Sequence, residues 1–96
     1  MTHFVLKLYV TGQSPRSEQA IANLRRLCES ELDGRCELSI IDVLERPHLA
    51  EAEKVLATPT LVKEMPPPIR RIVGDLSDVE KVLAALGLEA SPVAKV

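Results

Sequence analysis

The sequence predicts an α/β fold with the element order β-α-β-α-β-β-α. Three observations support this class: two β-branched aliphatic runs flank one amphipathic helix, a proline opens a third β-branched run, and a capped amphipathic segment follows. The 96 residues allow one domain, and its only aromatic residues are Phe4 and Tyr9. The predicted core is therefore aliphatic.

The first run, Phe4 to Val10, is aliphatic and aromatic except for Lys7. Such a run predicts a strand that is buried on both faces and central in its sheet. Ser14 and Pro15 then provide an N-cap and a first helical residue. The apolar residues that follow recur at helical spacing and predict one buried helix face. They are Ala20, Ile21, Leu24, Leu27, Cys28 and Leu32.

Gly34 is the expected C-cap of this helix, and Cys36 to Val43 is the expected second strand. A strand, a helix and a strand in this order predict two parallel strands. Pro47 fits the start of a short surface helix. Its apolar face would consist of Leu49, Ala52 and Leu56.

Pro59 opens the third strand, within the run Ala57 to Val62. Pro66, Pro67 and Pro68 predict a stiff extended connector, too stiff for a tight hairpin turn. The next segment, 69–73, fits either a strand or a helical turn; as a strand it places Arg70 and Arg71 on opposite faces. We favour the strand.

Ser77 and Glu80 form an expected capping box for the last helix, and Gly87 is its expected C-cap. The whole order is that of a thioredoxin-like fold, in which the Thr58–Pro59 step occupies the position of a cis-proline. Residues 1–90 form the expected single domain. Residues 91–96 form an expected flexible tail.

Composition excludes several classes of protein. The formal net charge of −2 argues against nucleic-acid binding through a positive field. No run approaches the ~18 apolar residues of a membrane span, and the start of the chain lacks the basic region of a secretory signal. We therefore expect a cytoplasmic protein. Cys28 and Cys36 match no zinc spacing, and we favour two reduced thiols over a disulfide.

No catalytic constellation is found. The helix start, where a redox enzyme of this fold would carry its cysteine, reads Gly12-Gln-Ser-Pro15. No candidate base lies close in sequence to Ser14 or Ser17, and His3 and His48 fit surface positions. Asp42 and Asp75 could form a carboxylate pair in space, but aspartate at strand ends and turns is ordinary structural usage. Lys63 with Arg70 and Arg71 could form a small basic patch. Because no catalytic constellation is found, the sequence favours an interaction protein over an enzyme. We expect no cofactor and no metal.

Several longer segments carry a specific resemblance. They are V-L-K-L-Y-V (5–10), G-x-S-P (12–15), I-D-V-L (41–44), L-A-T-P-T-L (56–61), P-P-P-I-R-R-I-V-G-D-L-S (66–77) and E-K-V-L (80–83). With these segments, the chain resembles the KaiB family of bacterial clock proteins from about Phe4 to Leu88. The combination of L-A-T-P-T with the proline-arginine segment is highly specific.

The resemblance implies a regulator that binds the KaiC hexameric ATPase and modulates its phosphorylation and output. It implies competition with a SasA-type kinase, and capture of KaiA. It places the partner-binding residues at Lys54, Val55, Arg70 and Arg71. The alternatives are a thioredoxin-like interaction or stress-response module that acts with a KaiC homologue without KaiA, and a degenerate oxidoreductase.

The resemblance also implies two folds. The free family member tends to form a homo-oligomer, a dimer or a tetramer with the order βαββααβ, whereas the binding form is a thioredoxin-like monomer. The residues associated with this change are Pro59, Pro66, Pro67, Pro68, Ala85 and Gly87.

The chain departs from the cyanobacterial pattern at several positions. Gln19 and Ala22 replace basic residues of the first helix, which puts KaiA binding in doubt. Ala85 replaces a glycine, and alanine favours a helix by about 1 kcal/mol. We therefore predict that this chain favours the thioredoxin-like form more than other family members do.

Overall fold

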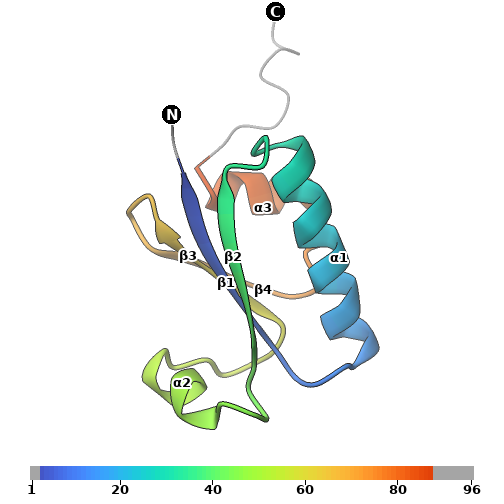
Figure 1. Cartoon of the computed structure of the whole chain (residues 1–96), viewed down its shortest axis with the longest axis vertical. Coiled ribbons are helices and arrows are strands. Elements are labelled where there is room, and N and C mark those ends of the chain that lie inside the picture. The colour runs from blue at the N-terminus through green and yellow to red at the C-terminus, as the bar shows by residue number, and fades with distance from the viewer. Residues whose placement is uncertain (1–2, 88–96) are drawn as a thin grey trace, which may run out of the picture.

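The structure is a computed structural model, and it describes residues 3–87 (Figure 1). Its element order, β-α-β-α-β-β-α, confirms the predicted fold class. The elements are β1 (Phe4–Val10), α1 (Pro15–Ser30), β2 (Cys36–Asp42), α2 (Pro47–Ala52), β3 (Thr60–Met65), β4 (Arg70–Val73) and α3 (Val79–Ala85). The end of the expected domain and the expected tail, 91–96, lie outside the described residues.

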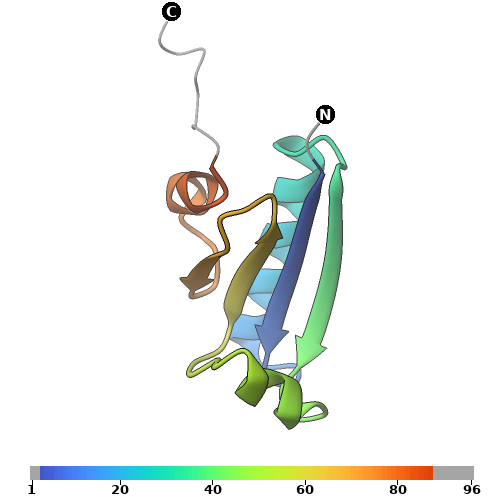
Figure 2. The same cartoon turned by 90° about the vertical axis from the view of Figure 1, so that its left-hand side faces the viewer.

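The four strands form one sheet with the order β2-β1-β3-β4. β1 is central, as its apolar sequence predicts, and pairs parallel with β2 and antiparallel with β3. β3 pairs antiparallel with β4. In Figure 2, β2 forms one edge of the sheet and the shorter β4 the other.

α1 and α3 both pack on one face of the sheet. Alternate residues of β1, from Phe4 to Val10, meet the apolar sides of both helices. The helix residues in this core are Ala20, Leu24, Leu27 and Cys28 from α1, and Val82 and Leu83 from α3. As expected, the core is aliphatic; its one aromatic side chain is Phe4.

α1 begins as predicted. Pro15 is its first residue, and the Ser14 hydroxyl accepts a hydrogen bond from the Ser17 backbone N–H at 3.2 Å. The helix ends earlier than predicted, with Glu31 as C-cap. Gly34, three residues beyond, adopts a left-handed φ of +73°, and its N–H donates to the Cys28 carbonyl.

The expectation of two reduced thiols is wrong. Cys28 and Cys36 form a disulfide, with their Cα atoms 6.2 Å apart. The last turn of α1 lies over the start of β2, because a short loop joins them. The disulfide therefore links this helix directly to its neighbouring strand.

The expectation that the proline segment is no tight hairpin turn is confirmed, because four residues separate β3 from β4 and the outermost strand pair is Lys63 with Arg70. β3 and β4 are joined through residues 66–69, where the Met65–Pro66 and Pro67–Pro68 peptide bonds are cis. The Thr58–Pro59 bond is cis as well, as the predicted fold implies. The strand alternative for residues 69–73 is the observed one, from Arg70 to Val73.

Two expectations about the other helices need correction. Asp78, not Ser77, is the N-cap of α3, and its carboxylate accepts from the Lys81 N–H at 3.2 Å. α2 ends at Ala52, so Leu56 is not on its apolar face; that side chain is 97% exposed. No described helix is long and apolar enough to cross a membrane.

Candidate functional site

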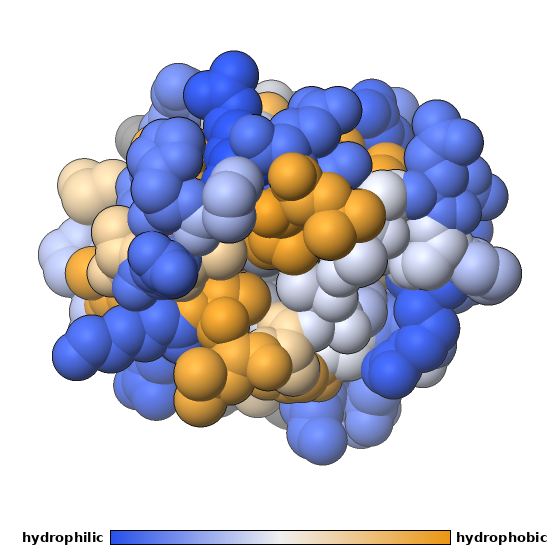
Figure 3. Space-filling model, turned by 90° about the horizontal axis from the view of Figure 1, so that it is seen from below, coloured by the Kyte–Doolittle hydropathy of each residue, from blue (hydrophilic) through white to orange (hydrophobic). Residues whose placement is uncertain are grey.

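The two most exposed large apolar side chains among residues 3–87 lie in the segments on either side of α2. Leu56 is 97% exposed and Leu44 is 68% exposed. Leu56 lines a shallow hollow with Val43, Ala50 and Val55 and with polar neighbours, and Leu44 directly follows Val43 in the chain. Figure 3 shows apolar surface at this end of the molecule. We call Val43, Leu44, Ala50, Val55 and Leu56 the α2-end surface.

The backbone at the edge of this surface has an unusual conformation. Lys54 has a φ of +55°, which turns the chain sharply after α2. Its side chain is exposed. The Val55 N–H donates to the Ala50 carbonyl at 2.9 Å and holds the turn against the helix.

Arg71 connects β4 to this turn. One guanidinium nitrogen donates to the Lys54 carbonyl at 3.3 Å, and another lies 3.5 Å from a Glu53 carboxylate oxygen. Both side chains of the ion pair are more than a third exposed, so the pair itself contributes little to stability. The two contacts of Arg71 instead fix the position of the turn after α2. As a result, three predicted partner-binding residues lie together: Lys54, Val55 and Arg71.

Arg70 is separated from that group. It lies directly opposite Lys63 on the neighbouring strand and faces the α3 side of the sheet. Lys63 is only 3% exposed, so it cannot be part of an exposed basic patch with Arg70 and Arg71. Burial, and secondarily the charge of Arg70, lower the pKa of Lys63.

The sheet face opposite α1 and α3 carries a polar layer. Lys7 and Glu64 form an ion pair at 3.1 Å, and the hydrogen bond to Glu64 raises the pKa of Lys7. Beside them Tyr9 is 1% exposed; burial, with a smaller effect of Glu53, raises its pKa. The role of Glu53 was missed from the sequence, because only the tertiary position of Arg71 reveals it.

The start of α1 holds hydroxyls in place of thiols. The Ser17 hydroxyl accepts from the Thr11 N–H at 3.1 Å and lies 2.9 Å from the Ser14 hydroxyl. Thr11 also hydrogen-bonds the Thr58 hydroxyl, beside Pro59. These groups satisfy one another and the backbone, and no histidine or carboxylate is among their hydrogen-bond partners in the described residues.

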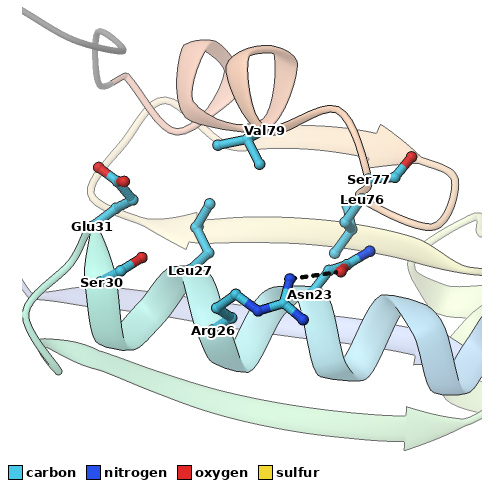
Figure 4. Close-up of a pocket in the computed structure, with 8 residues that line it drawn as sticks. All are labelled: Asn23, Arg26, Leu27, Ser30, Glu31, Leu76, Ser77 and Val79. Carbon is cyan, nitrogen blue, oxygen red and sulfur yellow. Dashed lines mark hydrogen bonds between the residues drawn. The ribbon is translucent and has the colours of Figure 1, made fainter.

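A second hollow, of about 200 Å³, lies between α1 and α3 (Figure 4). Leu27, Leu76 and Val79 form its apolar floor. The Asn23 amide at its rim donates to the Asp75 carbonyl at 2.8 Å and accepts from Arg26. Residues 3–87 contain no group of acidic, histidine and cysteine side chains that could hold a metal ion.

The residues expected to take part in a fold change lie in two places. Pro59 precedes β3, and the three consecutive prolines follow it, so both groups border the same strand. Ala85 is the last residue of α3; its C-cap is Leu86, not Gly87 as expected, and Gly87 follows with a φ of +86°. All of them belong to the second half of the chain.

Sequence comparison decides the family. The KaiB domain family matches residues 7–88, most of the chain. The chain belongs to the KaiB family. It is 54% identical over 92 residues to the circadian clock protein KaiB3 of Synechocystis sp. strain PCC 6803, covering 96% of this chain and 88% of that protein. It is 58% identical over 85 residues to the KaiB of Prochlorococcus marinus strain NATL2A, covering 88% and 79%.

Structural comparison places this KaiB family member in the thioredoxin-like class. The N-terminal domain of Synechococcus elongatus SasA matches with a TM-score of 0.72 and 26% identity, over 91% of this chain and 86% of that domain. Mitochondrial thioredoxin 3 of Saccharomyces cerevisiae matches with the same TM-score at 17% identity, over 92% of this chain and 81% of that protein, which shows a shared fold only. The described arrangement is thus the thioredoxin-like one of the family's two expected folds.

Proposed function

We propose that the protein is a non-enzymatic clock or timing regulator of the cytoplasm that binds a KaiC-type ATPase hexamer and modulates its phosphorylation state and output. The α2-end surface and the adjoining Lys54 carry the contact. The observation behind this choice is Leu56, a leucine that is 97% exposed at the margin of a shallow hollow lined also by Val43, Ala50 and Val55. Large apolar groups gathered in this way indicate a protein-interaction site.

The geometry supports a preformed contact. Cross-strand pairing of β4 and the bond from Arg71 to the Lys54 carbonyl hold the turn after α2 in place. A partner would therefore meet apolar side chains with a lysine at their rim and little ordering entropy to overcome. Arg71 acts in this proposal mainly by positioning, and Arg70 lies on the other sheet face.

Competition with a SasA-type kinase is part of the proposal. It is supported by the same fold in the SasA N-terminal domain at 26% identity. Two proteins of one fold and related sequence are plausible ligands for one site on a third. Capture of KaiA is a weaker expectation here, because Gln19 and Ala22 are exposed uncharged residues on α1.

For this reason a specific second candidate is a regulator that acts with a KaiC homologue without KaiA, in a timer or stress response. The two candidates share the KaiC contact. Adding KaiA to the preformed complex distinguishes them: a ternary complex supports the first candidate, and an unchanged binary complex supports the second.

The test is co-migration in size-exclusion chromatography with an ATP-loaded KaiC hexamer. The unmodified chain should co-elute with the hexamer, and Leu56→Asp should not. Glu37→Lys on β2 is a matched control that changes an exposed charge far from α2, and it should bind normally. Failure of the unmodified chain to co-elute with KaiC in every phosphorylation state would refute the proposal.

A further inference from the structure

Backbone hydrogen bonds position Cys28 and Cys36 independently of the bond between their sulfurs. The Cys28 carbonyl accepts from the Gly34 N–H at 2.9 Å. The Phe4 N–H donates to the Arg35 carbonyl, also at 2.9 Å, and Phe4 lies directly opposite Cys36 in the register of β1 with β2. The loop and the sheet therefore keep the two sulfurs near one another whether or not they are joined.

The two sulfurs differ in access. Cys28 is 8% exposed and belongs to the aliphatic core, whereas Cys36 is partly exposed at the margin of that core. Cys28 also lies in the last turn of α1, where the helix dipole and the apolar surroundings disfavour a negative charge. An incoming thiolate therefore reaches Cys36 first, and Cys36 is the better nucleophile of the reduced pair.

The proposed cytoplasmic location gives this pair a specific meaning. Cytosolic thiol systems reduce disulfides, so those that form in the cytoplasm are usually transient and serve catalysis or redox sensing. The pair is separate from the usual redox position of this fold, which is the start of α1 and reads Gly12-Gln-Ser-Pro15 here. Cys28 and Cys36 lie at the other end of that helix.

We propose that Cys28 and Cys36 form a reversible thiol–disulfide site. Its reaction partners are dithiol reductants and disulfides of the glutathione type, and Cys36 is the sulfur at which both enter. The inference rests on the cytoplasmic location proposed above and is independent of the contact with KaiC.

Reduction of this site takes two exchange steps. A thiolate of the dithiol attacks the Cys36 sulfur; a bond forms between these two sulfurs, the bond to Cys28 breaks, and its electron pair leaves on the Cys28 sulfur, which takes a proton from water. The second thiolate of the reductant then attacks the first sulfur of the reductant and releases Cys36, which is protonated in turn. Two electrons and two protons pass in total from the dithiol to the protein.

Oxidation runs in the opposite direction. The Cys36 thiolate attacks one sulfur of glutathione disulfide and displaces one glutathione thiolate, which leaves a mixed disulfide at Cys36. Cys28 loses its proton to water, attacks the Cys36 sulfur and displaces the second glutathione. Because the loop keeps Cys28 within reach, this mixed disulfide is short-lived in the unmodified chain.

The redox state of the pair acts on stability and not on the α2-end surface. Figure 1 shows the end of α1 and the start of β2 at the opposite end of the sheet from α2. Loss of a cross-link over a loop of this length raises the unfolded population by roughly 30- to 140-fold in the chain-entropy account. The reduced chain is therefore more open to proteases, and the thiol balance of the cytosol sets its lifetime.

Alkylation of the unmodified chain tests the assignment of the two sulfurs. The chain is reduced with dithiothreitol, freed of the reductant and treated briefly with iodoacetamide under native conditions, and its peptides are then mapped by mass spectrometry. Cys36 should be alkylated at least about tenfold faster than Cys28. Equal rates, or a faster Cys28, would overturn entry at Cys36.

Two matched variants trap the mixed disulfide. With glutathione disulfide, Cys28→Ser should accumulate one glutathione per chain, because no second thiol displaces it. Cys36→Ser should gain glutathione at least about tenfold more slowly. Circular dichroism checks that both variants are folded, and the alkylation of the unmodified chain stands without them. Equal gain by two folded variants would contradict the proposal.

A glutathione buffer set to the cytosolic poise tests reversibility. The unmodified chain should reach the same mixture of dithiol and disulfide from the reduced and from the oxidised side. Thermolysin should cleave the reduced form roughly 30- to 140-fold faster than the oxidised form, since cleavage follows the opened population. A chain that ends fully oxidised or fully reduced in this buffer would refute the proposal, whatever its binding to KaiC.

Discussion

Lys63 on β3 lies directly opposite Arg70 on β4, and the lysine of this pair is only 3% exposed. None of the three ion pairs among the described residues includes Lys63. Burial of the side chain lowers the pKa of Lys63, so folding disfavours the charged form of this lysine. The thioredoxin-like form thus carries a destabilising charge between β3, β4 and α3.

Lys63→Met should stabilise this form, because methionine keeps the volume of the side chain and removes the charge. The expected gain in unfolding free energy is on the order of 1 kcal/mol. Urea denaturation followed by circular dichroism measures it. Lys7→Met is the control: Lys7 pairs with Glu64, and its loss should cost up to about 1 kcal/mol. A lower urea midpoint for Lys63→Met than for the unmodified chain would contradict this view.

The same lysine predicts a pH dependence. Its pKa is lowered in the folded protein from the ordinary value of 10.5, so the folded state binds fewer protons than the unfolded state. The penalty is complete below the folded pKa and disappears as the pH rises from there towards 10.5. The advantage of Lys63→Met over the unmodified chain should therefore shrink as the pH rises towards 10.5. An advantage that is constant over this range would exclude titration of Lys63 as its cause.

The N-cap of α3 can be tested by comparing two neighbours. Asp78→Ala removes the acceptor of the Lys81 N–H and should cost about 1 kcal/mol of unfolding free energy. Ser77→Ala should change it by less than about 0.5 kcal/mol, since its side chain caps nothing. Thermal denaturation of both variants checks the order. A larger loss of stability for Ser77→Ala than for Asp78→Ala would instead support Ser77 as the N-cap, as the sequence predicted.

Reduction of the disulfide should destabilise the protein. The disulfide joins cysteines eight positions apart. In the chain-entropy account, removing a cross-link that closes a loop of this size lowers the free energy of unfolding by about 2–3 kcal/mol. Guanidinium unfolding with and without a dithiol reductant measures the difference. The double variant Cys28→Ala/Cys36→Ala is the control and should not respond to the reductant. If the unfolding midpoint of the unmodified chain does not change when the reductant is added, the disulfide does not stabilise the protein as expected.

Local patterns predicted most of the fold. The apolar run of β1, the Ser14-Pro15 start of α1 and the strand at 70–73 are as expected, because hydrophobic period and capping chemistry determine them locally. The errors depend on tertiary position. The spacing of Cys28 and Cys36 does not show that a helix end and a strand start meet, and nothing local distinguishes Asp78 from Ser77 as a cap.

The candidate site was predicted less completely. Lys54, Val55 and Arg71 come together as their common assignment implies, but Lys63 and Arg70 belong to the opposite face. Period-two alternation already separates Arg70 from Arg71; the burial of Lys63 arises only because α3 folds over β3 and β4. The exposure of Leu56 was missed because the helical spacing that seemed to include it ends at Ala52.

The sheet order has a consequence for how the protein opens. β3 sits between β1 and β4, so the segment beyond Met65 joins the sheet through a single four-residue ladder. Its other described attachments are the core packing of Leu76 and α3, the hydrogen bond from Asn23 to the Asp75 carbonyl, and the contacts of Arg71 with the turn after α2. That segment can separate while the other three strands stay paired and the disulfide holds α1 to them. Amide hydrogen exchange should therefore show two cooperative units with a boundary at the prolines, the second exchanging through a lower-energy opening than the first.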